Sequence, residues 1–260
     1  MDRTAILARP RKRATTRASP PAISIDGDCD AGYYRFTKAP RTSEEAAKRA
    51  MATRTDVPEV VVERLPQYLR ALAHLKESGI EIISSQQLGE LLQVTPAQIR
   101  KDLSYFGRFG KQGRGYSISN LLGHLRSILG LDQTWNVAVV GIGRLGRAII
   151  SYPGFEPEGF RIVCAFDSDK HVVGQWAGGL MIHDFSEFKK VAAAESVRIA
   201  VVAVPAAAAQ DVIDGLVDAG VKAILNYAPK SAMAPSNVRI RNVDPVVALQ
   251  SMTYYLSTGR

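Results

Sequence analysis

The feature that most constrains the fold is a short glycine-rich turn past the middle of the chain. Residues 137–140 are apolar, as in a buried strand, and they run directly into Gly141-x-Gly143-x-x-Gly146. A second apolar stretch follows and ends on Asp167. A strand, a turn of this spacing, a helix and an acid at the end of the next strand are typical of a dinucleotide-binding βαβ unit. We therefore predict a Rossmann domain in the C-terminal half.

Each glycine of this turn has its own physical role. Gly141 permits the tight turn out of the strand, Gly143 lets the backbone approach a pyrophosphate, and Gly146 lets helix and strand pack closely. Asp167 can accept hydrogen bonds from both ribose hydroxyls, and its charge would repel a 2′-phosphate. The pattern therefore favours NAD(H) over NADP(H). The alternative, a Rossmann-like domain with an empty site, has little support, since strand, turn and helix all occur in the required order.

Other residues are expected beside this turn. Val204, Pro205 and Asn226 end later strands, close to the point where such sheets bind ligands, although ordinary turn chemistry also explains them. Arg144 and Lys170 could place positive charge near phosphate or ribose, and either could equally be a solvated surface residue. The cofactor-site candidates are Gly141, Ile142, Gly143, Arg144, Leu145, Gly146, Asp167, Lys170, Val204, Pro205 and Asn226.

Charge and composition separate the N-terminal part from the rest. The 260 residues suffice for two domains, and most of the net charge of +8 lies in the N-terminal half. Residues 1–56 are rich in Arg, Pro, Ser and Thr without sustained periodicity, so we predict a disordered basic extension. It could contact phosphates without sequence preference or have no specific role.

Compartment and metal content follow from what the sequence lacks. No apolar run approaches the roughly 18 residues of a membrane-spanning helix, and no apolar segment follows the basic N-terminus as in a secretory signal. The two cysteines, Cys29 and Cys164, suggest neither a disulfide framework nor a metal site. We expect a cytoplasmic protein without membrane or metal partners.

The segment before the Rossmann domain has the pattern of a DNA-binding fold. Apolar spacings of three and four predict three helices between residues 57 and 106, and Thr95-Pro96 begins the third. A glycine-rich stretch and a short strand near residues 116–118 follow. This is the order of a winged helix-turn-helix.

The third helix supplies candidate contacts to DNA. Ile99 and Leu103 face the core, which leaves the polar side chains on the other face. Arginine can pair bidentately with guanine and glutamine with adenine, whereas lysine and serine usually hold phosphate. The alternative is a charged helix on an ordinary surface. The candidates, including the basic wing, are Gln98, Arg100, Lys101, Ser104, Tyr105, Arg108, Lys111, Arg114 and Tyr116.

The predicted fold class is α/β, with an N-terminal winged helix-turn-helix and a C-terminal Rossmann domain of parallel strands wrapped by helices. Strands are expected at about residues 136–140, 161–166, 199–204 and 222–225. The predicted parts are the extension at 1–56, the DNA-binding domain at 57–134, the cofactor domain at 135–245 and a C-terminal helix at 246–260.

From residue 57 to about 256 the chain resembles the Rex family of redox-sensing transcriptional repressors. The resemblance rests on the recognition-helix run 100–107, the wing Gly113-x-Gly115-Tyr116, the turn at 141–146, Tyr152-Pro153-Gly154-Phe155, the run 225–229 and Val243-Asp244. Two positions depart from the family pattern: Val172, where a basic residue is often found, and Pro245, where an apolar side chain is usual.

The resemblance implies a homodimer in which the C-terminal helix is swapped into the partner subunit. It implies that NADH releases the protein from operator DNA, whereas NAD+ permits binding. It also implies that Arg70, Tyr152 and Asp244 form a switch that senses the nicotinamide. Arg70 pairing with Asp244 in one state only would give the state-dependent contact that a switch requires.

Two other functions compete with this one. An NAD-dependent oxidoreductase with an appended DNA-binding domain would need a positioned acid or base. The four histidines, His74, His124, His171 and His183, belong to no recognisable catalytic constellation, and little chain remains for a substrate domain. A structural DNA binder would leave the glycine turn unexplained. We therefore predict a repressor that is not an enzyme.

Overall fold

The computed structural model describes residues 57–110 and 114–257. The predicted basic extension at 1–56 and the predicted DNA contact Lys111 lie outside these described residues. None of the described helices is both long enough and apolar enough to span a membrane.

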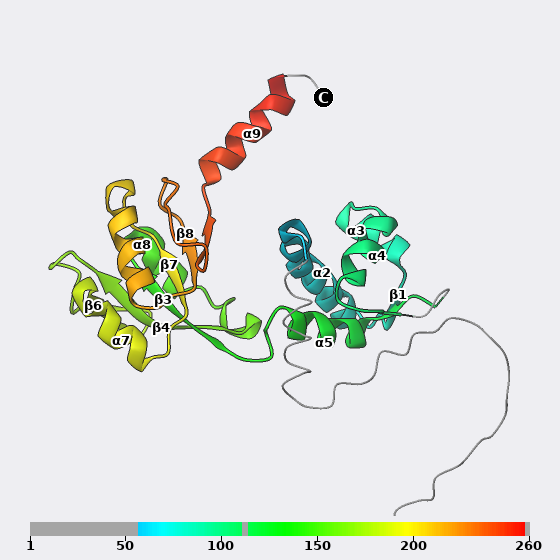
Figure 1. Ribbon diagram of the computed structural model, residues 1–260, viewed down its shortest axis with the longest axis horizontal. Coiled ribbons are helices and arrows are strands. Elements are labelled where there is room, and N and C mark those ends of the chain that lie inside the picture. Colours follow the sequence, from blue (N-terminus) through cyan, green and yellow to red (C-terminus); the bar gives the residue numbers. More distant parts are fainter. Residues whose placement is uncertain (1–56, 111–113, 258–260) are drawn as a thin grey trace, which may run out of the picture. The chain divides into compact units, whose positions relative to one another are not determined.

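The first part of the described chain is a winged helix-turn-helix (Figure 1). A two-stranded antiparallel sheet pairs Ile82 with Ser117 and Ile83 with Tyr116, which ties the wing to the helices. The elements are α2 (Glu59–Glu77), β1 (Ile82–Ile83), α3 (Ser85–Leu92), α4 (Pro96–Ser104), β2 (Tyr116–Ser117) and α5 (Ile118–Ile128). The predicted order of elements is confirmed.

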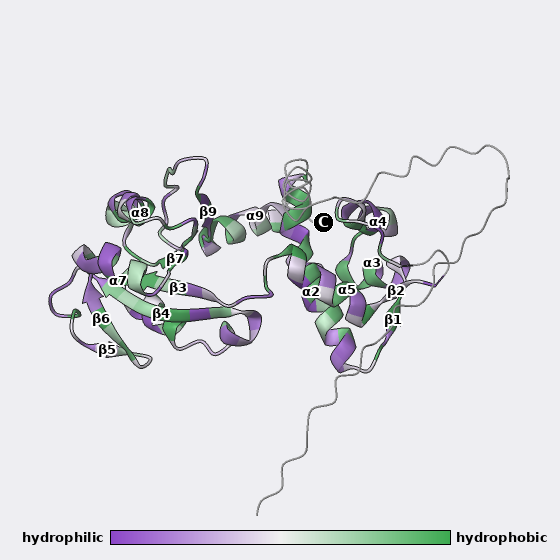
Figure 2. Cartoon of the chain, turned by 60° about the horizontal axis from the view of Figure 1, so that its bottom comes forward, coloured by the Kyte–Doolittle hydropathy of each residue, from purple (hydrophilic) through white to green (hydrophobic). Residues whose placement is uncertain are grey.

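Local sequence explains these helices. Figure 2 shows hydrophobic and hydrophilic residues alternating along α2 and α5, as expected for helices with one buried face. A capping box between Ser84 and Gln87 starts α3, and the Thr95 side chain accepts a hydrogen bond from the backbone N–H of Gln98 to start α4. The last helix of the motif ends at Ser104 rather than near Phe106, because the Phe106 N–H turns back to the Leu103 carbonyl at 3.0 Å.

The second part is a seven-stranded sheet with helices on both faces. Its strands lie in the order β5-β6-β4-β3-β7-β8-β9, all parallel except β5. The strand order runs outward from β3 through β4 on one side and from β7 through β8 on the other. The switch point typical of a Rossmann fold therefore lies between the carboxyl ends of β3 and β7, in the middle of the sheet. The strands are β3 (Trp135–Val140), β4 (Phe160–Asp167), β5 (Trp176–Ala177), β6 (Leu180–Asp184), β7 (Ile199–Val202), β8 (Ala223–Asn226) and β9 (Arg239–Asn242).

Alternating side chains of the central strands enter two separate cores. Val140 and Val202 pack with helices α7 (Phe188–Ala194) and α8 (Ala209–Asp218) on one face. Val139 and Val201 pack with α6 (Arg144–Ile150) on the other. This two-sided burial explains the nearly continuous apolar runs in the sequence.

The structure also contains strands that the sequence did not predict. Strands β1, β5, β6 and β9 were not predicted, and β7 ends at Val202 rather than at residue 204. Two exposed arginines, Arg239 and Arg241, make β9 read as polar. Charged residues of this kind are common on edge strands, where they prevent pairing with other chains.

The C-terminal helix α9 (Pro245–Ser257) has no buried residue. Val247, Leu249 and Met252 are each about three-fifths exposed. Apolar side chains exposed along a whole helix indicate a surface that is covered in another assembly.

Candidate functional site

The glycine turn lies between β3 and α6, at the switch point of the sheet. Gly141 has φ +91°, and a Cβ there would lie 2.6 Å from the carbonyl oxygen of Ala203. A Cβ on Gly146 would lie 2.0 Å from the carbonyl oxygen of Gly141. Gly143, by contrast, faces open space, with no atom within 4 Å of a Cβ built on it. The first and third glycines therefore serve packing, and the second leaves the backbone accessible.

Asp167 at the end of β4 is held by three backbone N–H groups. Its Oδ2 accepts from Ile142 at 2.7 Å, and its Oδ1 accepts from Ser168 at 2.8 Å and Asp169 at 3.0 Å. An ionised carboxylate offers about four acceptor positions, so room for a further donor remains. The carboxylate thus fastens the glycine turn to the end of β4.

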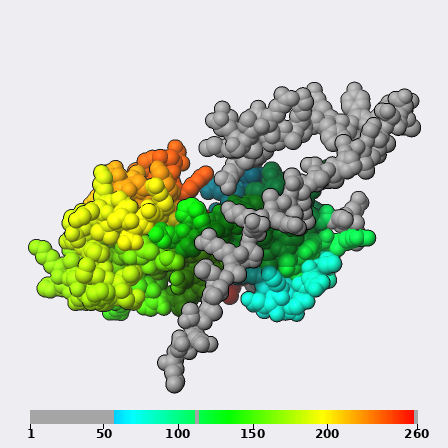
Figure 3. Space-filling view, turned by 90° about the horizontal axis from the view of Figure 1, so that it is seen from below, coloured from blue at the N-terminus to red at the C-terminus, as the bar shows by residue number. Residues whose placement is uncertain are grey.

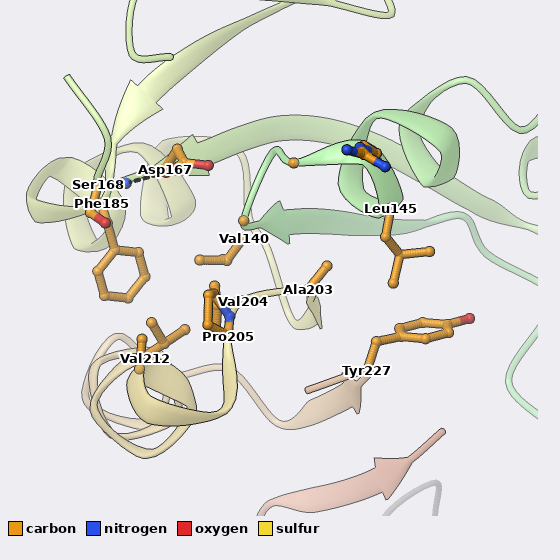
Figure 4. A pocket seen from close by; sticks show the side chains of 14 residues that line it. Val140, Leu145, Asp167, Ser168, Phe185, Ala203, Val204, Pro205, Val212 and Tyr227 are labelled. Atoms are coloured by element: carbon orange, nitrogen blue, oxygen red, sulfur yellow. Dashed lines mark hydrogen bonds between the residues drawn. The ribbon is translucent and has the colours of Figure 1, made fainter. Parts of the chain in front are cut away.

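A cavity of about 460 Å³ lies beside the turn. Figure 4 shows Phe185, Val204 and Val212 directed into a common space on one side and Leu145 and Tyr227 on the other. Predicted cofactor residues that line this cavity are Gly141, Gly143, Arg144, Leu145, Asp167, Val204 and Pro205. A mostly apolar cavity with a few polar groups at a switch point is the form that nucleotide sites take.

Four predicted residues do not line the cavity. Ile142 and Gly146 are buried beneath the turn. Lys170 is exposed, and the pKa of Asp184 is lowered by hydrogen bonding with Ser186 and by the Lys170 charge. Asn226 is fully buried, and its Nδ2 donates to the Lys230 carbonyl at 2.9 Å and to Asn242 Oδ1 at 2.8 Å. Asn226 therefore fastens the turn after β8.

The sequence did not predict several cavity residues. Phe185 follows β6, a strand that was missed, and Val212 lies on α8. Ala203 and Tyr227 each follow a parallel strand by one residue. Both belong to strand ends that the sequence indicates as possible lining of the nicotinamide side, because ligands bind outside the carboxyl ends of parallel strands.

The predicted recognition helix α4 has one buried and one exposed face. Ile99 is fully buried and Leu103 nearly so, whereas Arg100, Lys101 and Ser104 are exposed. In Figure 3 the cyan residues of α3 and α4 lie together at the surface. The exposed face of α4 therefore carries the polar side chains that a DNA groove requires.

Contacts inside the domain orient several of these side chains. Arg100 donates from Nη1 to Ser85 Oγ at 2.9 Å, and Ser104 Oγ donates to the Lys101 carbonyl at 2.6 Å. Tyr105, Arg108 and Arg114 are exposed.

The position of Tyr116 differs from the prediction that its side chain contacts DNA. The structure places it in the core of the domain at 9% exposure, because its strand pairs with β1 and turns the ring inward. Burial raises the pKa of its hydroxyl. Tyr116 thus stabilises the wing, and little of it is accessible to DNA.

A buried carboxylate that the sequence reasoning overlooked lies on the inner face of α4. Asp102 is fully buried and accepts from Nε and Nη2 of Arg64 at 2.6 and 2.8 Å. Its oxygens also accept from the Tyr68 hydroxyl at 2.6 Å and from Gln98 Nε2 at 2.7 Å. Burial alone would raise the pKa of Asp102, but the hydrogen bonds from these three residues outweigh burial and lower it. Asp102 is therefore ionised at neutral pH.

The three residues of the predicted switch are not all brought together. Arg70 and Tyr152 line one cavity of about 620 Å³ with Phe155 and Leu225. The Tyr152 ring is exposed and meets Phe155 edge-on, with centroids 5.3 Å apart. Asp244 does not line this cavity, and its Oδ1 accepts from the Val246 N–H at 2.9 Å at the start of α9. Among the described residues, no group of His, Cys, Asp and Glu is placed to hold a metal.

Family models match both halves of the chain. Residues 56–104 match a model described as a putative DNA-binding protein N-terminus, and residues 132–230 match one described as a CoA binding domain. A redox-sensing transcriptional repressor Rex from Chloroflexus aggregans is 56% identical over 200 residues, which cover 77% of this chain and 94% of the relative. A Rex from Lactobacillus acidophilus is 42% identical over 204 residues, which cover 78% and 97%.

Solved structures of a protein called RSP are also similar to this chain. A crystal structure of RSP in complex with β-NAD+ and operator DNA has a TM-score of 0.75 and 37% sequence identity, covering 78% of this chain and 94% of that one. RSP in complex with β-NADH has a TM-score of 0.71 and 35% identity, covering 78% and 96%. RSP is described as a Rex-family repressor.

Proposed function

This chain belongs to the Rex family of redox-sensing transcriptional repressors, and we propose from that premise that it represses genes by binding operator DNA and leaves the DNA when NADH binds. One observation carries the proposal: the chain joins a nucleotide cavity at a Rossmann switch point to an exposed polar recognition helix. RSP, whose fold is similar over 78% of this chain, has been crystallised with NAD+ and operator DNA and with NADH.

The charge of Asp167 favours NAD(H) over NADP(H) and CoA. NAD(H) has two free hydroxyls on its adenosine ribose, whereas NADP(H) and CoA each carry a phosphate there. Asp167 can accept from hydroxyls and would repel a phosphate at this place. The cavity in this chain therefore fits NAD(H) better than the CoA that gives the matched domain family its name.

We predict that Asp167→Ala narrows the preference for NADH over NADPH at least tenfold. The substitution would remove an attractive contact with the ribose hydroxyls of NADH and a repulsive contact with the phosphate of NADPH. A contribution of about 1 kcal/mol from each contact is sufficient for this change. Binding of both nucleotides is measured by fluorescence titration. The Ile142 N–H also loses its acceptor, so Asp167→Asn serves as a second variant that keeps an acceptor oxygen. An unchanged NADH/NADPH ratio in both variants would place the adenosine ribose elsewhere.

On the DNA side, we propose that α4 enters the major groove with Arg100 and Gln98 near base edges and Lys101 and Ser104 near phosphates. Arg108, Arg114 and Lys111 would add charge along the wing. A protein that binds operators works where the chromosome is, so we propose the cytoplasm. Selection of bound sequences from random duplex DNA tests this part; recovery of no consensus would refute it.

We propose that the nucleotide cavity senses rather than catalyses. Its only carboxylate among the described lining residues is Asp167, which already accepts three backbone hydrogen bonds. Sustained turnover of NADH with a small carbonyl or hydroxyl substrate, measured at 340 nm, would contradict this proposal.

We propose a homodimer in which α9 is swapped into the partner subunit, beside Arg70 and Tyr152. The exposed apolar side chains of α9 need a cover, and the cavity that Arg70 and Tyr152 share is largely apolar. A partner helix there would bring Asp244 of one subunit toward Arg70 of the other, as the predicted switch requires.

Leu249→Asp should convert the dimer to a monomer, because it places a charge on the apolar face of α9. Gln250→Glu, on the neighbouring exposed position, is the matched control and should remain dimeric. Light scattering of the full chain distinguishes the two states. A wild-type monomer at micromolar concentration would contradict the proposed assembly.

A further inference from the structure

Asp102 holds a position that is unusual for a residue of a recognition helix. It is fully buried, although it lies in the middle of the helix that presents Arg100 and Lys101 to solvent. A buried carboxylate is costly unless donors surround it. Here Arg64 supplies two N–H groups in a bidentate arrangement, and the Tyr68 hydroxyl supplies a third donor, all from α2. The carboxylate of Asp102 is therefore fixed in place from outside α4.

The fourth donor to Asp102 comes from α4 itself. Gln98 Nε2 lies 2.7 Å from Asp102 Oδ1. A carboxamide has a donor end and an acceptor end that can be exchanged by rotation. An ionised carboxylate only accepts, so only the nitrogen end of Gln98 can face Asp102. This contact fixes the direction of the Gln98 carboxamide.

Within the described part of the chain, the contact leaves the Oε1 and one N–H of the Gln98 carboxamide without a hydrogen-bond partner. One acceptor beside one donor is the pair that reads the N6 amino group and N7 of adenine in the major groove. Gln98 is the third residue of α4, partly exposed at the end of the recognition helix that reaches base edges in this motif.

We propose that Asp102 is a positioning residue for sequence readout, which orients the Gln98 carboxamide so that it recognises an adenine in each half-site. The inference rests on the proposed function, because it requires α4 to lie in the major groove. The place of α4 is also secured by Ile99, Leu103 and the Thr95 cap. A purely structural Asp102 would therefore change the affinity for all sequences alike, whereas a positioning residue changes the preference at one base pair.

The test compares base-preference profiles of full-length variants on duplexes selected from random DNA. In Asp102→Asn the new side chain can either accept a hydrogen bond from Gln98 or donate one to it. The Gln98 carboxamide therefore loses its fixed direction. Asp102→Asn and Gln98→Ala should each reduce the preference for the same adenine, by roughly 5- to 150-fold as for one bidentate pair. The double variant should show no further loss at that position, and NADH binding should not change.

A matched control lies in α8, where Gln210 Nε2 donates to the exposed Asp214 Oδ1 at 2.8 Å with the same spacing of four residues. Asp214→Asn should leave the whole profile unchanged. The proposal is overturned if Asp102→Asn weakens all sequences equally, or if it and Gln98→Ala affect different base pairs. If the wild type selects no consensus at all, the proposed function fails instead.

If Asp102→Asn does not fold, the same question can be put to the wild type by NMR. Of the two side-chain amide protons of Gln98, assigned by their absence in Gln98→Ala, the one donated to Asp102 should exchange slowly with water. A Gln98 carboxamide that exchanges as fast as that of an exposed glutamine would overturn the proposal.

Discussion

Replacing Arg100 with alanine should abolish operator binding while leaving NADH binding intact. Arg100 is exposed on α4, and its guanidinium is directed by Ser85 at the start of α3. A bidentate arginine contact to guanine is worth about 1–3 kcal/mol, and a symmetric dimer would make it twice. A loss of about 2–6 kcal/mol corresponds to roughly 30-fold or more in affinity.

Gel shift with the selected duplex measures this loss, and fluorescence titration with NADH serves as the internal control. Ser104→Ala on the same exposed face is the matched variant, and it should cost far less because a serine hydroxyl holds phosphate at most. Loss of both DNA and NADH binding in Arg100→Ala would indicate misfolding. Unchanged DNA affinity would show that α4 does not read the operator.

Replacing Gly143 with valine should abolish NADH binding and produce a repressor that NADH no longer releases. A Cβ at Gly143 meets no atom within 4 Å, and the backbone there has φ −71°, so the folded chain accommodates a side chain. The same side chain would occupy the space through which a pyrophosphate approaches the backbone. We expect NADH affinity to fall at least 100-fold without loss of operator binding.

Two other glycines make this prediction specific. Gly146→Ala would bring a Cβ within 2.0 Å of the Gly141 carbonyl oxygen, so it should lower the melting temperature. Gly123→Ala in α5 also faces open space, so it should raise the melting temperature slightly, as alanine does in a helix interior, and leave NADH binding unchanged. Gly143→Val with normal NADH affinity would show that the dinucleotide does not approach this turn.

The sequence predicted the features that depend on spacing along the chain. The glycine turn was recognisable because its three glycines have a fixed spacing between an apolar strand and a helix. The helices α3 and α4 were recognisable because Thr95-Pro96 and the apolar periodicity act locally. The wing and the Rossmann strands buried on both faces followed from the same kind of pattern.

Features that depend on distant partners could not be predicted. Arg64 and Asp102 meet across 38 positions, and the sequence alone shows Asp102 as one more charge on an amphipathic helix. Phe185 lines the nucleotide cavity because it directly follows β6. The polar residues of β6 prevented its prediction as a strand, so this position of Phe185 was not foreseen. Asn226 was predicted to contact the cofactor and Tyr116 to contact DNA, because of their positions in motifs. In the structure both side chains are buried inside the protein, and Asn226 bonds to the Lys230 carbonyl.

The redox form of the nicotinamide must change the distribution between two states of the protein. A ligand that binds both states equally shifts neither, however tightly it binds. The contacts that we propose for the glycine turn and Asp167 would be common to NADH and NAD+, so discrimination must arise at the nicotinamide end. We propose that Arg70, Tyr152 and the partner's Asp244 provide it.

The most direct test of this account is a gel-shift titration of the selected operator complex with NADH and, separately, with NAD+. We expect NADH to dissociate the complex at saturation and NAD+ to leave it bound. Equal dissociation by the two forms at saturation would contradict a redox sensor, even if both nucleotides bind.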